Sequence, residues 1–106
     1  MTINARNKGS AYERKLAKEF RELGYTECRT SREVSKIRDN MGVDLCGVPD
    51  FNVQAKAVEN LGSVHMILKS MPEEVGVTNV VFHKRNRKGE VVSMKKEDFY
   101  KLITKE

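Results

Sequence analysis

The chain has 106 residues, of which 39% are hydrophobic and 33% are charged, and we expect one domain over residues 1–106 with a single modest core. Its 20 Lys and Arg residues exceed its 15 Asp and Glu residues, which gives a formal net charge of +5. This excess favours a polyanionic partner because phosphates attract cations at long range, although a basic domain without such a partner has the same charge.

Several classes of protein are excluded by what the sequence lacks. Cys28 and Cys46 are too few for a zinc site without several nearby histidines, and the sequence has only His65 and His83, so both cysteines are expected to be reduced thiols. No apolar run approaches the roughly 18–20 residues that a membrane-spanning helix needs. Residues 1–8 also lack the apolar core of a signal peptide. We therefore expect a cytoplasmic protein without membrane contact.

The first predicted element is a helix that follows a loose polar segment at residues 1–9. Ser10 and Glu13 have the spacing of a capping box, which predicts that Ser10 is the N-cap, and Gly24 offers a stop after Leu23. Helical spacing places an apolar group on one face of this helix, made up of Tyr12, Leu16, Ala17, Phe20 and Leu23. Glu13 falls within that face, so its carboxylate needs a partner, a metal or a proton there, and a capping role is the alternative.

The later elements follow from changes in hydrophobic period. We expect a strand over residues 25–30, a polar basic connection over 31–40, and two short strands within residues 42–58. A helix is predicted from Ser63 to Met71, and residues 79–84 and 90–94 should form a hairpin whose tip is 85–89. A last helix is predicted from Lys96 to about Lys105, with Phe99, Leu102 and Ile103 at helical spacing. The order αβββαββα predicts an α/β (mixed α+β) fold with a mixed central sheet flanked by helices.

The two short strands within residues 42–58 bring chemically useful side chains together. Apolar residues alternate along the second strand, which places Gln54 and Lys56 on one face, and Val43 and Leu45 place Asp44 on the face opposite to theirs. If residues 48–50 form a three-residue hairpin loop, Asp44 lies opposite Gln54. A carboxylate, an amide oxygen and a lysine then converge on one side of the hairpin.

This group has the chemistry of a metal-assisted phosphodiesterase. Magnesium prefers hard oxygen ligands, which the Asp44 carboxylate, the Gln54 side chain and the Ala55 carbonyl offer. A bound cation neutralises developing charge and lowers the pKa of a bound water. Lys56 is placed to orient the attacking water or to stabilise the transition state. The alternative is an exposed strand face on which Gln54 and Lys56 have no catalytic role.

The pattern of Glu13, Asp44 and Gln54-Ala55-Lys56 resembles the PD-(D/E)XK nuclease superfamily, and within it the small Holliday junction resolvases of archaea and phages. The resemblance covers about residues 7–57, including Lys8-Gly9-Ser10 before the helical acid. It implies a restriction-endonuclease-like core, metal ligation by Glu13, Asp44 and Gln54, and a catalytic Lys56. It also implies a serine or basic residue after the first strand, for which Ser31 and Arg29 are the nearest candidates and Ser35 lies behind them. Gln54 departs from the usual acidic residue, which removes one negative charge from the metal site.

Basic residues that could track DNA phosphates gather in two segments, and Lys8 lies near the N-terminus. The first segment contains Arg29, Arg32, Lys36 and Arg38, and the second, at the predicted hairpin tip, contains Lys84, Arg85, Arg87 and Lys88. Charged hairpin tips are also found with no partner other than solvent. Few aromatic residues accompany these cations, so recognition of DNA shape and backbone is favoured over base stacking.

Together these features predict a Mg²⁺-dependent endodeoxyribonuclease in which Mn²⁺ can substitute. We expect a homodimeric Holliday junction resolvase acting on four-way or branched DNA, because two sites related by a two-fold axis suit two symmetric cuts. One alternative is a restriction-type or nicking nuclease acting on duplex DNA. A second is a DNA-binding protein of the same fold without catalysis, and a third is a basic protein-interaction domain.

Overall fold

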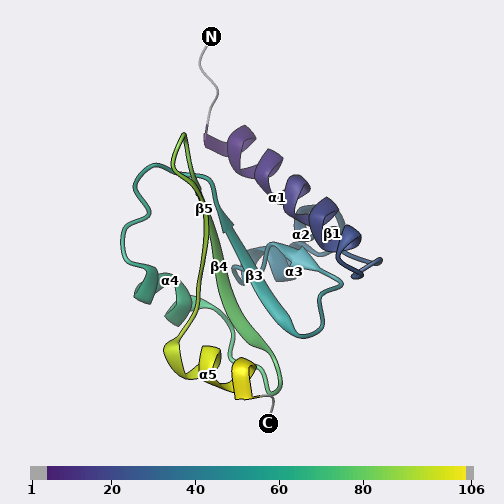
Figure 1. Cartoon of the computed structure of the whole chain (residues 1–106). Helices are drawn as coiled ribbons and strands as arrows, with labels where there is room; N and C mark the ends of the chain where they lie inside the picture. The colour runs from purple at the N-terminus through teal and green to yellow at the C-terminus, as the bar shows by residue number, and fades with distance from the viewer. Residues whose placement is uncertain (1–4, 105–106) are drawn as a thin grey trace.

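The computed structural model describes residues 5–104, which fold into helices packed around a small mixed β-sheet (Figure 1). This arrangement confirms the expected mixed α/β class. In chain order the elements are α1 (Ala5–Glu22), β1 (Arg29–Thr30), α2 (Ser31–Val34), α3 (Lys36–Asn40), β2 (Leu45–Cys46), β3 (Phe51–Lys56), α4 (Val64–Ser70), β4 (Thr78–Arg85), β5 (Gly89–Ser93) and α5 (Lys96–Thr104).

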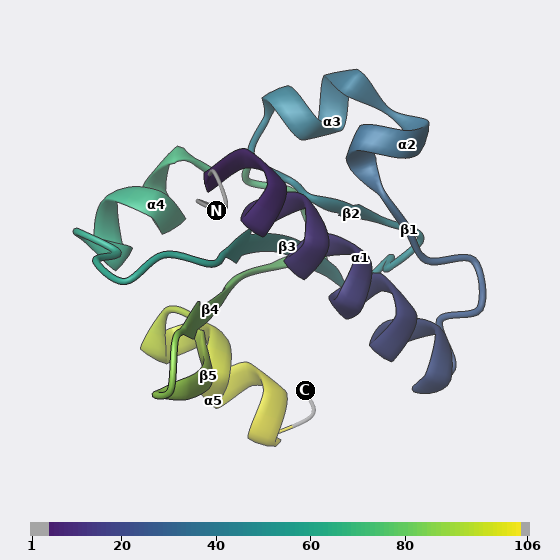
Figure 2. The same cartoon turned by 90° about the horizontal axis from the view of Figure 1, so that it is seen from above.

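The main sheet has three strands in the order β3-β4-β5. Strands β3 and β4 are parallel, with Gln54 in register with Val81 and Lys56 in register with His83, and the connection between them carries α4. Strand β5 is antiparallel to β4. Strands β1 and β2 form a separate antiparallel pair, and α2 and α3 lie together beside it, away from α4 and α5 (Figure 2).

The core lies on both faces of the β3–β4 pair because consecutive side chains of a strand point to opposite faces. On one face, the buried Leu16 of α1 belongs to the same cluster as Val53 and Val80. On the other face, Leu68 of α4 packs with the buried Val81. Helix α1 is thereby fixed against the strand that carries Gln54 and Lys56.

The predicted start of the first helix is wrong. Helix α1 is already formed at Ala5, so Ser10 lies inside it and caps nothing; its hydroxyl accepts a hydrogen bond from the Arg14 guanidinium at 2.8 Å. Ala, Arg and Lys before Gly9 are strong helix formers, which explains the extension past a short and permissive capping signal. Residues 1–4, also expected to be loose, lie outside the described residues. The predicted apolar face is otherwise confirmed, except that Leu23 is exposed just beyond the helix.

The expected strand over residues 25–30 is reduced to Arg29–Thr30. Residues 25–28 form a turn instead, closed by a hydrogen bond from the Cys28 N–H to the Tyr25 carbonyl, while Tyr25 packs edge-on against Phe20. The polar connection over 31–40 contains the short helices α2 and α3. Such short helices depend on tertiary contacts more than on propensity, so the sequence alone gives little sign of them.

The two strands around Asp44 exist, but they do not form the expected hairpin ladder. Strand β2 pairs with β1 and β3 pairs with β4, while a turn closed by the Phe51 N–H and the Val48 carbonyl joins β2 to β3. Asp44 therefore lies opposite the segment from Val53 to Ala55 without belonging to a ladder, because it bonds the Val53 carbonyl and the Ala55 N–H individually. The exposure pattern predicted for its neighbours is confirmed, since Val43 and Leu45 are buried.

The C-terminal half follows the predicted elements closely. Ser63 caps α4 by accepting a hydrogen bond from the Met66 N–H, and the 79–94 region forms the expected hairpin. Helix α5 is present up to Thr104, with residues 105–106 outside the described part. Its apolar residues are largely exposed, with Phe99 at 48% and Ile103 at 60%. Within residues 5–104, no helix is both long enough and apolar enough to cross a membrane.

Gly47 is predicted to be essential for joining β2 to the 25–28 turn. Its φ of +84° disfavours other residues, and a Cβ there would lie 2.5 Å from the Glu27 carbonyl oxygen. Gly62 is the matched control, because its φ is +76° but a Cβ would meet nothing within 4 Å. We expect Gly62→Ala to lower the free energy of unfolding by about 1 kcal/mol through backbone strain. Gly47→Ala should cost about 1–3 kcal/mol more through steric overlap. Equal losses in chemical denaturation would contradict the close approach.

Candidate functional site

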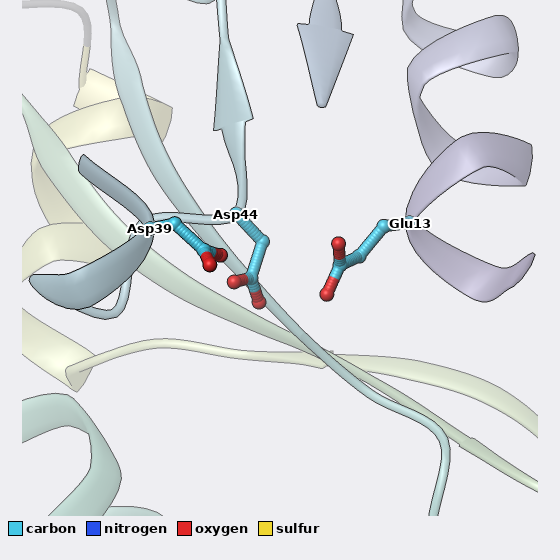
Figure 3. A group of neighbouring side chains, drawn as sticks. All are labelled: Glu13, Asp39 and Asp44. Carbon is cyan, nitrogen blue, oxygen red and sulfur yellow. The ribbon is translucent and has the colours of Figure 1, made fainter. Parts of the chain in front are cut away.

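Three carboxylates converge at the edge of β3 that faces away from β4. Glu13 comes from α1, Asp39 from α3, and Asp44 from the chain just before β2, and each offers an oxygen within 4.8 Å of the other two. Their side chains point into one common space (Figure 3). Glu13 and Asp44 are only 3% and 7% exposed, whereas Asp39 is partly exposed. We call these three residues the acidic cluster.

Asp44 is held in place by hydrogen bonds from both its backbone and its side chain. Its N–H donates to the Val53 carbonyl at 2.7 Å, and its carboxylate accepts a bond from the Ala55 N–H at 2.7 Å. Its own carbonyl accepts a bond from the Ser31 N–H at 2.8 Å. The burial of Val43 and Leu45 on either side fixes the phase of this segment, so the carboxylate has little freedom to turn away from β3.

Glu13 lies where the helix phase predicts, on the buried face of α1. Its partner is Arg32 of α2, whose Nε lies 2.7 Å from the Glu13 Oε1, in an ion pair with a second bond at 3.3 Å to Oε2. A buried carboxylate needs such a partner, because the charge is costly to remove from water. Arg32 therefore neutralises one member of the acidic cluster.

Asp39 is the site residue that the sequence analysis missed. It lies in α3, whose N-cap is Ser35: the Ser35 hydroxyl accepts a hydrogen bond from the Arg38 N–H at 3.2 Å. The available sequence signal for Asp39 is its position four residues after Ser35 and five residues before Asp44. This signal is weak, because residues 31–40 are expected to form an irregular connection, in which the direction of a side chain has no period to define it.

Gln54, Ala55 and Lys56 line the strand beside the acidic cluster. The Gln54 Oε1 atom is buried and has no hydrogen-bond partner among the described residues. A Cβ at Gly42 would lie 3.6 Å from that same atom, so the glycine leaves room beside the amide. The Ala55 N–H bonds Asp44, and the N–H and C=O of one strand residue point to the same side, so the Ala55 carbonyl also faces Asp44.

These donors fit a hard divalent cation. Carboxylate, amide and carbonyl oxygens are the ligands that Mg²⁺ and Mn²⁺ prefer, and Mg²⁺ usually takes one or two carboxylates and retains several waters. Glu13, Asp39 and Asp44 would supply the charge, and the buried unpaired oxygen of Gln54 is a polar atom that still lacks a partner. Asp39 also supplies the second negative charge that Gln54 does not.

Ser31, a predicted catalytic residue, is completely buried. Its hydroxyl lies 3.3 Å from the Cys46 sulfur and its N–H donates to the Asp44 carbonyl. Cys46 and Cys28 are both free thiols. In this structure Ser31 holds the chain that carries Asp44.

The basic residues of the 29–38 segment are mostly engaged within the protein. Besides the Arg32 ion pair, Arg38 bonds Glu74 at 3.0 Å and Asn52 at 2.8 Å, and Arg29 donates to the Cys28 carbonyl. Lys36 is exposed. Outside this segment, Lys8 lies 4.0 Å from Glu59, and Lys84 lies over the Tyr12 ring and in register with Glu90. Arg85, Arg87 and Lys88 are exposed at the β4–β5 tip.

The position of Asp44 changes its proton affinity. Burial raises the pKa of the Asp44 carboxyl to about 6, with smaller contributions from the negative charges of Glu13 and Asp39. The bond from the Ala55 N–H and the positive charge of Lys56 act in the opposite direction and favour the ionised form. A cation bound at the acidic cluster would also favour the ionised form.

We predict that Asp44 destabilises the metal-free protein at neutral pH. Its pKa is about 6 in the folded state and 3.8 as the reference value, so the folded state binds more protons and stability falls as pH rises between these values. Asp44→Asn removes this cost while keeping an oxygen for the Ala55 N–H. With EDTA present, the variant should exceed the wild type in free energy of unfolding by about 2–3 kcal/mol at pH 7.5, and by much less at pH 4.

The matched control for this measurement is Asp50→Asn, which removes an exposed carboxylate. Its effect on the free energy of unfolding should be small at both pH values. An Asp44→Asn effect that is the same at pH 4 and pH 7.5 would contradict the assigned environment of Asp44.

The candidate site thus consists of the acidic cluster, the β3 residues Gln54, Ala55 and Lys56, and the Arg32 guanidinium that pairs with Glu13. Comparisons with family models, with curated proteins and with solved structures gave no match.

Proposed function

We propose that this chain is a metal-dependent DNA endonuclease with a restriction-endonuclease-like core, acting as a Holliday junction resolvase. The observation that carries the proposal is the convergence of Glu13, Asp39 and Asp44 within 4.8 Å beside a strand that carries Gln54 and Lys56. The parallel β3–β4 pair, with α1 on one face and α4 on the other, is the scaffold expected for such a core.

The acidic cluster would hold Mg²⁺ or Mn²⁺, with the Gln54 and Ala55 oxygens as neutral donors. When bound, such an ion supplies positive charge that stabilises the phosphodiester transition state and makes a water molecule more acidic. Clustered carboxylates repel one another, and this repulsion favours binding of a cation. Arg32 reduces the repulsion in the metal-free protein by pairing with Glu13.

Besides the proposed metal ion, Lys56 of β3 contributes a positive charge to the site. It shares a face of β3 with Gln54, and its charge acts on the Asp44 carboxyl. An ammonium group at this position can donate a hydrogen bond to the attacking water or to a phosphate oxygen. Lys56 is thus the proposed catalytic lysine, with Asp44 as the principal metal-binding residue.

DNA is the proposed substrate because the chain carries a net charge of +5 although it contains this acidic cluster. Cationic side chains can hold a DNA duplex by its phosphates, so that the shape of the DNA determines which substrate is selected. A homodimer would place two such sites around a four-way junction. Exposed apolar side chains on β5 and α5, including Val91, Val92 and Phe99, provide surface for self-association.

The nearest rival functions share the fold and differ in chemistry. A restriction-type or nicking nuclease would use the same acidic cluster on linear duplex DNA. A binding-only protein would keep the basic surface without hydrolysis, and the neutral Gln54 is the feature that favours it. A basic protein-interaction domain would show no salt-dependent DNA binding.

Divalent-metal binding should depend on Asp44 and Asp39. We expect Mg²⁺ or Mn²⁺ to raise the melting temperature of the wild type, since an ion that binds only the folded state stabilises it. Asp44→Asn should abolish this shift, and Asp39→Asn should weaken the apparent affinity on the order of tenfold. Titration by differential scanning fluorimetry and calorimetry measures both effects, with Asp50→Asn as the control. An unchanged affinity in Asp39→Asn would remove Asp39 from the ligand set.

Cleavage should be selective for branched DNA. A labelled four-way junction and a linear duplex of the same sequence are incubated with Mg²⁺ and, separately, with EDTA. We expect symmetric nicks in the junction, none with EDTA, and a loss on the order of 100-fold or more in Asp44→Ala. Equal cutting of both substrates would favour the restriction-type alternative.

Undiminished cleavage by Asp44→Ala would exclude the site itself. Gln54→Glu tests the binding-only alternative. If the wild type does not cleave DNA and this variant does, the wild type is a binding-only protein whose nuclease site has lost one negative charge.

A further inference from the structure

The two basic segments of the chain differ in how far their charges are already neutralised. In the 29–38 segment, Arg32 is paired with Glu13, and Arg38 is paired with Glu74 at 3.0 Å and bonded to Asn52. Using either arginine to bind a phosphate would break an ion pair within the protein. That competition reduces what this segment can add to DNA affinity.

The tip of the β4–β5 hairpin has free charges. Arg85, Arg87 and Lys88, which we call the tip cations, are all exposed. Within residues 5–104, their side chains make no ion pair or hydrogen bond with another protein group. Counterions that are released from such side chains and from DNA on binding are the main source of affinity for phosphates.

The tip is nevertheless fixed in position. Its backbone continues the β4–β5 ladder up to Arg85 and Gly89, and the Lys88 N–H donates to the Arg85 carbonyl at 3.2 Å. The Asn86 N–H donates to the Glu59 carboxylate at 2.7 Å, which attaches the tip to the segment that follows β3. A fixed tip loses less conformational entropy on binding than a loose loop would.

The tip lies beyond the end of the strand that carries Lys56. Because β3 and β4 are parallel and Lys56 is in register with His83, Arg85 follows Lys56 by two positions along the sheet, and the turn over 86–88 lies just beyond it before Gly89 returns to the level of Arg85. At about 3.3 Å per residue, this places Arg85 roughly 7 Å past Lys56, with Arg87 and Lys88 in the turn close beyond it. Phosphates of one DNA strand rise about 3.4 Å each along the helix axis, so this distance spans roughly two or three of them. Arg85 also has the strand phase of His83, and therefore shares a face with Lys56.

Arg87 has an unusual backbone conformation for a residue at this position. Its φ of +62° is the one positive value recorded for a non-glycine residue in the part of the chain described here. Glycine adopts this conformation without a steric penalty, whereas a residue with a Cβ does not. A strained, exposed arginine is consistent with a role for its side chain that glycine could not fulfil.

We propose that the tip cations, rather than the ion-paired Arg32 and Arg38, form the principal contact with the DNA backbone, on the strand flanking the phosphate that is cut. The inference rests on the proposed function, since it takes DNA as the partner of the acidic cluster. The acidic cluster repels phosphate electrostatically, and the tip cations supply the attraction that holds the strand beside it.

The first test measures binding of a fluorescent four-way junction by anisotropy, with EDTA present, over a series of salt concentrations. The variant Arg85→Ala/Arg87→Ala/Lys88→Ala is compared with Lys18→Ala/Lys69→Ala/Lys101→Ala, which loses the same charge from exposed positions elsewhere. The tip variant should reduce the slope of log K against log salt by about 2–3 and weaken binding on the order of 100-fold at 0.1 M salt. The control variant should change both much less.

A second variant separates loss of contact from loss of folding. Arg87→Gly removes one charge but suits the positive φ, so its melting temperature should equal or exceed that of the wild type. Its junction affinity should still fall several-fold, with a slope smaller by about 1. Arg87→Lys keeps the charge and should retain most of the affinity.

The outcomes distinguish the inference from the proposed function. A tip variant that binds as the wild type does would overturn the inference and leave the nuclease proposal intact. Equal losses in the tip and control variants would also overturn it, since they would indicate net charge alone. If the wild type never cleaves DNA but the tip variant specifically loses junction affinity, the tip contact would be supported and the nuclease proposal contradicted. No salt-dependent binding by the wild type would refute both.

Discussion

The hydrogen bond between the Asp44 carboxylate and the Ala55 N–H joins the two parts of this fold. One part is the three-stranded sheet, and the other is the β1–β2 pair with its short helices. Asp44 bridges them twice, because its backbone N–H also bonds the Val53 carbonyl at 2.7 Å. Two main-chain groups on this edge of β3, the Val53 carbonyl and the Ala55 N–H, are thus satisfied by one residue in place of a neighbouring strand. The residue proposed to bind metal is also a structural link.

This double role has an energetic cost that the rest of the site limits. A buried carboxylate beside two others is unfavourable in the absence of a cation, and burial raises the pKa of Asp44 to about 6. The Arg32–Glu13 ion pair and the Ala55 N–H offset part of this cost. Sites that bind charge commonly reduce stability, because the groups that recognise a ligand repel one another before it arrives.

The sequence was most informative where a residue lies in a long regular element. Glu13 was located from the phase of an 18-residue helix, and Gln54 with Lys56 from the alternation of a six-residue strand. The acidic residue of a five-residue helix, Asp39, could not be located in this way, because that helix depends on contacts made far away in sequence. The partner of β2 was missed for a related reason. A two-residue strand carries no pattern that distinguishes pairing with β1 from pairing with β3.

The segment 31–40 contains two side chains that influence the acidic cluster in opposite ways. Arg32 brings a positive charge to Glu13, and Asp39 adds a negative charge beside Asp44. Both belong to short helices at the surface, while Glu13 and Asp44 are fixed by the core. Substitution of the partly exposed Asp39 can therefore alter the net charge of the acidic cluster without repacking the interior, whereas substitution of Arg32 would also leave the buried Glu13 without its partner. The charge of the acidic cluster and the stability of the fold are thus separable at Asp39 and coupled at Arg32.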